Sequence, residues 1–163
     1  MSPTMANDRQ NRAGGEAARK LGSTLGGFMI QAGGPQIAAI SLDGFDTHAG
    51  QPGQIATRLS YMDAVLDGLH AGLGAEWKNT VVIAVTEFGR TARVNGTGGT
   101  DHGRGNVLWL LGGPVAGGRV GVTLSDPFCV ERHRAEFLRM IGADVDLLVA
   151  NEHELRSLYQ TED

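Results

Sequence analysis

Three short apolar runs, each next to a polar segment that contains glycine, constrain the fold of this chain most. The runs cover residues 37–42, 81–85 and 107–111, and the polar segments cover residues 43–48, 86–90 and 98–103. Apolar runs of this length, bounded by turn residues, are typical of buried β-strands. Ligands of open α/β sheets bind in the crevice outside the strand ends. The sequence therefore predicts one polar site where these segments converge.

A helix is expected between the first two runs. Apolar residues recur there at steps of three and four: Ile55, Leu59, Met62, Leu66, Leu69 and Leu73. This spacing indicates an amphipathic helix with one buried face. A strand, a helix and a second strand at this spacing predict a crossover unit with parallel strands. We therefore expect an α/β fold, a three-layer sandwich with a mainly parallel sheet.

The N-terminal part is expected to hold a further helix. Residues 1–12 are polar and are predicted to be a disordered lead-in. Apolar residues then recur at helical spacing from Ala17 onward. This helix is expected to stop at the glycine pair before Pro35, which is a strong helix breaker.

The C-terminal part predicts two more strands and two more helices. Residues 120–124 and 146–150 are short apolar runs, and a helix is expected between them. Asn151 is followed three residues later by Glu154, which predicts a capping box at the start of the last helix.

Composition and charge exclude several classes of function. The chain has 163 residues, 41% of them hydrophobic, and a formal net charge of -4. This length suits about one domain, and the charge gives no basic footprint for nucleic acid. No apolar run approaches the ~20 residues of a membrane span, and no secretory signal begins the chain, so we expect a cytoplasmic location. The single cysteine, Cys129, excludes an intrachain disulfide.

The first polar segment holds three candidate metal ligands. Asp43, Asp46 and His48 lie within six positions of one another. Carboxylates and imidazoles bind divalent metals and also move protons. The alternative is that the two aspartates organise the turn by accepting hydrogen bonds from backbone amides.

The second and third segments extend this candidate site. Glu87 is expected just past a strand end, as a metal ligand or base, with Arg90 binding an anion; the alternative is a Glu87–Arg90 ion pair on a loop. Asp101 and His102 are adjacent and flanked by glycines, which permit close backbone approach to a ligand. The alternative for this pair is a polar surface turn.

A family resemblance covers residues 13 to about 120. The stretches SLDGFDTHAGQ, VVIAVTEFGRTARVNGTGGTDHGRGNV and LLGGPVAGGRV resemble the C-terminal half of the bacterial DUF1501 proteins. Those proteins are similar to the alkaline phosphatase and sulfatase superfamily. The resemblance implies a metal-dependent hydrolase that acts on small phosphate or sulfate esters. DUF1501 proteins often carry a twin-arginine export signal, which this chain does not show.

The resemblance also implies a ligand set. It suggests one divalent metal ion, Zn, Mn or Ca, with Arg90 or Arg104 neutralising the anion. The metal ligands would come from all three segments: Asp46, His48, Glu87 and His102. Asp43 and Asp101 are further candidates. Phe88 stands where the superfamily has a ligand, and the half that carries the superfamily's nucleophile is missing. We therefore expect a domain that is inactive or incomplete in this chain.

Residues 122–163 resemble part of an adenosine-kinase-like PfkB sugar kinase, which predicts a seam near Gly121. The fragment lacks the glycine-rich segment that holds the kinase aspartate, so kinase activity is not expected. Two other interpretations stay open. The chain could be a non-catalytic interaction module that oligomerises with itself through open sheet edges, or a protein related to the PfkB kinases through its tail.

Overall fold

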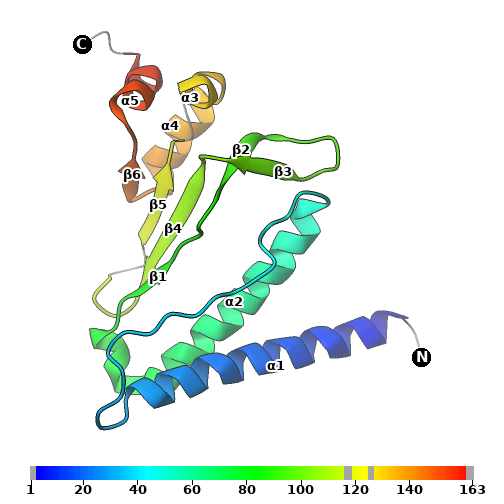
Figure 1. Ribbon diagram of the computed structural model, residues 1–163, viewed down its shortest axis with the longest axis vertical. Coiled ribbons are helices and arrows are strands. Elements are labelled where there is room, and N and C mark those ends of the chain that lie inside the picture. Colours follow the sequence, from blue (N-terminus) through cyan, green and yellow to red (C-terminus); the bar gives the residue numbers. More distant parts are fainter. Residues whose placement is uncertain (1–2, 116–118, 125–126, 161–163) are drawn as a thin grey trace. The chain divides into compact units, whose positions relative to one another are not determined.

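The computed structural model describes residues 3–115, 119–124 and 127–160. The chain divides into two compact units, Met1–Trp77 and Lys78–Asp163, and each is described by itself. The first unit is helical, whereas the second contains the strands found among the described residues (Figure 1).

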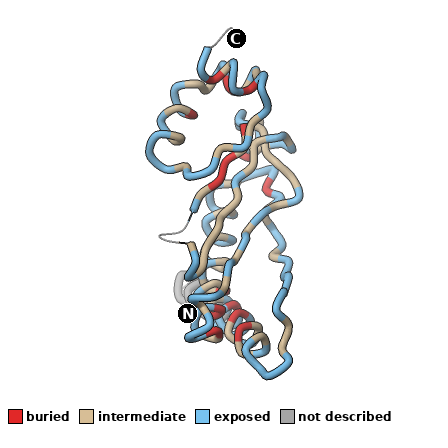
Figure 2. Tube along the Cα trace, turned by 90° about the vertical axis from the view of Figure 1, so that its left-hand side faces the viewer, coloured by how far each residue is buried: buried red, intermediate tan, exposed pale blue. Residues whose placement is uncertain are grey.

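Two long helices form the first unit. They are α1 (Pro3–Met29) and α2 (Gln51–Leu73), and the short helix η1 (Gly74–Asn79) follows α2 directly. The buried side chains of this pair come from one face of each helix: Ala18, Val65, Leu69 and Leu73. Buried positions accordingly concentrate along the helices of this unit (Figure 2). Leu69 and Leu73 confirm two positions of the apolar stripe that the sequence predicts.

Glycines set the distance between α1 and α2. Gly22 and Gly26 of α1 lie against α2, and Gly68 and Gly72 of α2 lie against α1. A Cβ atom on Gly26 would lie 2.7 Å from the backbone nitrogen of Leu73, closer than real Cβ contacts. The backbones therefore approach each other where side chains are missing.

The segment between the two helices differs from the prediction. Residues 37–42, expected to be a buried strand, form no strand in the structure, and Ile37 is 90% exposed. A strand needs a neighbour for its backbone groups, and no ladder includes these residues. Helix α1 begins at Pro3, within the segment expected to be a disordered lead-in, whose residues 1–2 lie outside the described part.

The second unit holds a four-stranded sheet and a separate two-stranded one. The large sheet has the order β1 (Val82–Ala84), β4 (Asn106–Leu111), β5 (Arg119–Thr123), β6 (Leu147–Val149); the hairpin pairs β2 (Gly89–Val94) with β3 (Thr100–Gly103). Only β5 and β6 are parallel, while β1–β4 and β4–β5 are antiparallel. The α/β character is thus confirmed, but the prediction of a mainly parallel sheet is wrong.

The connections explain these strand directions. Parallel neighbours need a long crossover, and β5 reaches β6 through α3 (Pro127–Arg132) and α4 (Arg134–Ala143). The chain between β1 and β4 contains a hairpin and no helix, so β4 returns antiparallel to β1. The expected crossover before β1 does not form because residues 37–42 are not a strand.

One hydrophobic core joins the helices of this unit to the end of the sheet. Leu124, Val130, Phe137 and Leu158 are buried together, and Leu148 of β6 packs against them. The helices share this core instead of covering both faces of a parallel sheet, as a three-layer sandwich would require. The last helix, α5 (Glu152–Tyr159), has the predicted capping box between Asn151 and Glu154.

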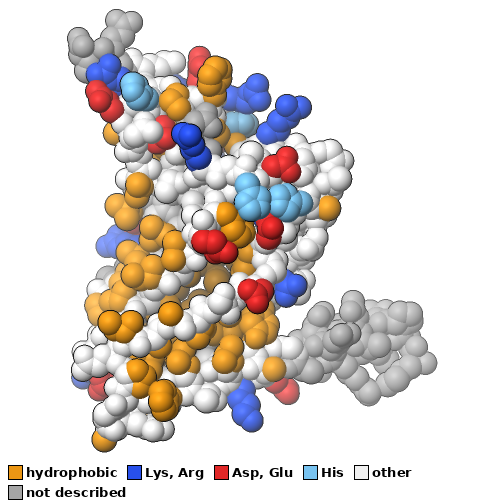
Figure 3. Space-filling model, in the orientation of Figure 1, with side chains coloured by type: hydrophobic (Ala, Val, Ile, Leu, Met, Phe, Trp, Pro, Cys, Tyr) orange, Lys and Arg blue, Asp and Glu red, His pale blue; other side chains and the backbone are white. Residues whose placement is uncertain are grey.

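Apolar side chains also remain at the surface of this unit. Val81, Ile83 and Val85 alternate along and beside the edge strand β1 and are 50%, 62% and 67% exposed. Hydrophobic side chains reach the surface on the face shown in Figure 3. Within the described residues, no helix has the length and apolar character needed to cross a membrane.

Candidate functional site

The loop that leads into α2 carries the first polar segment. The amide of Thr47 donates a hydrogen bond to the Phe45 carbonyl at 2.9 Å, which closes a tight three-residue turn centred on Asp46. After the turn, the Gln54 side chain donates to the Ala49 carbonyl at 2.5 Å. This bond ties the end of the loop to the first turns of α2.

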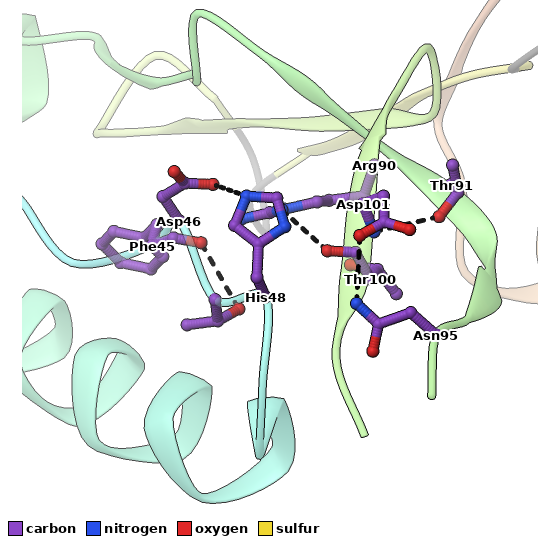
Figure 4. A network of polar contacts seen from close by, with 9 residues as sticks. Phe45, Asp46, His48, Arg90, Thr91, Asn95, Thr100 and Asp101 are labelled. Atoms are coloured by element: carbon purple, nitrogen blue, oxygen red, sulfur yellow. Dashed lines mark hydrogen bonds and ion pairs between the residues drawn. The ribbon is translucent and has the colours of Figure 1, made fainter. Parts of the chain in front are cut away.

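The turn brings Asp46 and His48 together. Asp46 Oδ1 lies 3.0 Å from His48 Nε2, and the side chains are 53% and 45% exposed (Figure 4). Two ligand atoms on one tetrahedral zinc ion lie about 3.3 Å apart, given bonds of about 2.0–2.1 Å. The spacing of this pair is therefore close to that of two ligands of one ion. The remaining acid of the loop, Asp43, is exposed.

Arg58 of α2 was not anticipated as a residue of this loop. Its guanidinium lies against Gly44, whose φ of 91° belongs to the region that favours glycine. A glycine between two acidic positions, followed by a basic residue in the next helix, was the available signal, and it is a weak one.

The hairpin β2–β3 of the second unit carries Asp101. Asp101 Oδ1 accepts a hydrogen bond from Asn95 Nδ2 at 3.0 Å, and the Asp101 amide donates to Thr91 Oγ1 at 3.2 Å (Figure 4). The Asn95 side chain also accepts bonds from the amides of Thr97 and Gly99. Asp101 thus helps to organise the hairpin turn.

Arg90 contributes to the same hairpin. Its Nη1 donates to the Thr100 carbonyl at 2.9 Å, and its guanidinium carbon lies 4.8 Å from the centre of the Phe88 ring. Among the described residues no ion pair joins Arg90 to Glu87, which is exposed. Arg90 therefore supports the hairpin from within and is not paired with the acid that the sequence places beside it.

Phe88 also contacts the histidine of the third segment. The rings of Phe88 and His102 lie 5.1 Å apart at an angle of 35°. Thr86 Oγ1 accepts a hydrogen bond from the Phe88 amide at 3.2 Å, which fixes the backbone before the hairpin. Arg104 is exposed, and its carbonyl accepts a bond from Thr123 Oγ1 at 3.0 Å.

Two of the predicted residues lie close enough to hold one metal ion. Within the described part of the first unit these are Asp46 and His48, whose ligand atoms lie 3.0 Å apart. His102, in the second unit, contacts Phe88. Asp101 instead bonds to the hairpin, whereas Asp43 and Glu87 are exposed.

Comparisons with known proteins identify the family. The sequence model of DUF1501, described as a protein of unknown function, matches residues 2–154. No curated protein and no solved structure matches the chain. The family match continues through Gly121, where a seam was expected, so the resemblance of the tail to a PfkB kinase has no support and residues 122–154 belong to the same family region. The chain is thus a member of the DUF1501 family.

Proposed function

We propose that this chain binds a divalent metal ion through Asp46 and His48 and hydrolyses phosphate or sulfate esters with it. The observation that carries the proposal is the Asp46–His48 pair, whose ligand atoms lie 3.0 Å apart on a surface loop. The family resemblance supplies the substrate class.

The donor set favours zinc or manganese over calcium. Imidazole nitrogen suits zinc, whereas calcium takes six to eight oxygen ligands. Catalytic zinc sites have three protein ligands and one open position for water or substrate. Asp46 and His48 supply two such ligands. When bound, the ion would polarise the ester oxygen and lower the pKa of a bound water.

The loop that carries the two ligands is already ordered. The turn at Phe45–Thr47 holds Asp46 beside His48, so that these two ligands need little rearrangement. Ligands that are already oriented lower the entropic cost of binding.

Metal binding is tested by thermal unfolding with Zn²⁺ and Mn²⁺. A free metal concentration of 100 times Kd stabilises the native state by about 2.7 kcal/mol, which for a chain of this size raises Tm by roughly 5–10 °C. Asp46→Asn and His48→Asn should each reduce the rise. His153→Asn replaces an exposed histidine on α5 and is the matched control. An unchanged Tm of the wild type at millimolar metal would contradict the proposal.

Hydrolysis is tested separately with p-nitrophenyl phosphate and p-nitrophenyl sulfate. The metal-loaded chain should release p-nitrophenol, and His48→Asn should abolish the release. Metal binding without any ester hydrolysis would retain the metal site and reject the proposed reaction.

A second candidate function is favoured by the exposed apolar residues of β1. Val81, Ile83 and Val85 lie at an edge of the sheet, where unpaired backbone groups invite another strand. An interaction module that associates with a second copy of itself would cover this edge.

A further inference from the structure

Arg58 lies against the loop that holds the proposed metal ligands. We infer that Arg58 binds the anionic phosphate or sulfate group of the substrate, and this inference rests on the proposed function. The residues expected to bind the anion from the sequence were Arg90 and Arg104, both from the second unit. Arg58 belongs to α2, in the same unit as Asp46 and His48.

The contact between Arg58 and Gly44 places the guanidinium. A Cβ atom on Gly44 would lie 2.5 Å from Arg58 Cζ and 2.8 Å from Nη2, so any larger residue would displace the guanidinium. The φ of Gly44, 91°, is also strained for other residues. The glycine of the segment DGFDTH thus creates the space in which Arg58 rests on the backbone.

The donors of Arg58 are available to a ligand. Other arginines are engaged: Arg19 with Asp67, Arg119 with Asp146, Arg156 with Glu152. In the described part of the chain, no hydrogen bond or ion pair engages Arg58, which is exposed. Arginine presents a planar set of donors that matches phosphate and sulfate oxygens bidentately.

The sequence spacing puts Arg58 within reach of a metal-bound anion. Gly44 and Asp46 are two residues apart, so their Cα atoms are separated by at most about 7 Å. An oxyanion that bridges the two groups has one oxygen about 2.1 Å from the metal and another about 2.8 Å from the guanidinium. The spacing limits the separation of the two backbone positions, and calorimetry with and without Zn²⁺ tests whether one anion contacts both groups. Arg90 is a weaker candidate because it already donates to Thr100 and lies over Phe88.

The test measures binding of inorganic phosphate and of inorganic sulfate to the full chain by calorimetry, with and without Zn²⁺. Arg58→Ala should weaken anion binding at least about tenfold, as loss of a charge-assisted pair does. Arg58→Lys should lose part of the affinity because an ammonium cannot bind bidentately. Arg104→Ala, the arginine suggested by the family resemblance, should leave it unchanged.

Gly44→Ala is the second variant. It keeps Arg58 but displaces the guanidinium, so it should also weaken anion binding, while circular dichroism reports whether the fold is retained. Zn²⁺ affinity of Arg58→Ala should equal that of the wild type. Unchanged phosphate and sulfate affinity in Arg58→Ala, or a loss in Arg104→Ala alone, would overturn the inference.

The two proposals fail in different ways. If the wild type binds no metal, the proposed function fails, and phosphate binding by the metal-free chain then decides the role of Arg58. Loss of that binding in Arg58→Ala would support the anion site by itself. No binding of phosphate or sulfate by the wild type under either condition would reject it.

Discussion

The ring of Phe88 lies 5.1 Å from the imidazole of His102, tilted by 35°. The guanidinium of Arg90 lies 4.8 Å from the centre of the same Phe88 ring. The superfamily resemblance implies a metal ligand at the position of Phe88, whose ring cannot bind a metal. In this chain Phe88 contacts a histidine and an arginine of the hairpin.

Replacing Phe88 should release the ring of His102. We expect the His102 ring protons to lose their ring-current shift in the NMR spectrum of Phe88→Leu but not of Phe88→Tyr, because tyrosine keeps the aromatic ring. An unchanged shift in Phe88→Leu would contradict the contact.

The helix pair predicts opposite effects for two adjacent glycines. Gly26→Ala places a methyl group 2.7 Å from the Leu73 backbone nitrogen and should lower the free energy of unfolding by about 1–3 kcal/mol. Gly27→Ala meets no atom within 4 Å and should raise it by up to about 1 kcal/mol, because alanine favours helix. Urea unfolding followed by circular dichroism compares the two. Equal effects would contradict close packing at Gly26.

Asp146 predicts a dependence of stability on pH. The Val120 amide donates to its carboxylate and the Arg119 guanidinium pairs with it, and both lower the pKa of Asp146 below its ordinary 3.8. Because the folded state holds the charged form more strongly, this contribution is present above the unfolded pKa and is lost as pH falls through the lower folded pKa.

The measurement is the Tm of the wild type and of Asp146→Asn between pH 7 and pH 2. The wild type should melt higher at pH 7, and the difference should shrink as the pH falls through the ordinary pKa of 3.8 and then through the lower folded pKa. Asp144→Asn removes an exposed carboxylate whose nearest arginine contact is 3.8 Å, and it is the matched control. A difference that persists unchanged at pH 2 would mean that the charge of Asp146 is not its cause.

The exposed edge of the sheet predicts self-association. Light scattering after size exclusion should show a concentration-dependent dimer, because Ile83 and its neighbours leave an apolar edge uncovered. Ile83→Lys should shift the chain to monomer, since a charged lysine on an edge strand opposes pairing. Lys78→Ala, in the short helix before β1, is a control for altered surface charge. A wild-type monomer at all concentrations would contradict the prediction.

Local sequence patterns predicted some elements closely. The runs 81–85 and 107–111 contain β1 and most of β4, and the Asn151–Glu154 capping box begins α5 as expected. Such patterns succeed because they depend on neighbours within a few residues. The run 37–42 failed because an apolar run becomes a strand only when another strand satisfies its backbone groups.

The candidate site was predictable only in part. The sequence singled out Asp46 and His48 by residue type, and the structure places their ligand atoms 3.0 Å apart. It could not identify Arg58, because the contact with Gly44 depends on how the loop folds back onto α2. It also could not show that Arg90 is engaged by Thr100 and Phe88.

By itself, the sequence determined the approximate positions of most helices and of the strands β1, β4, β5 and β6, the family and the residue types available for metal binding. Only the tertiary structure decided the directions of the strands, the glycine contacts between α1 and α2, and which polar side chains meet. The physical reason is that periodicity and capping are local, whereas strand partners and side-chain contacts join residues far apart in the chain. Asp46 and His48 are an instructive exception, because a tight turn of three residues is enough to bring them together.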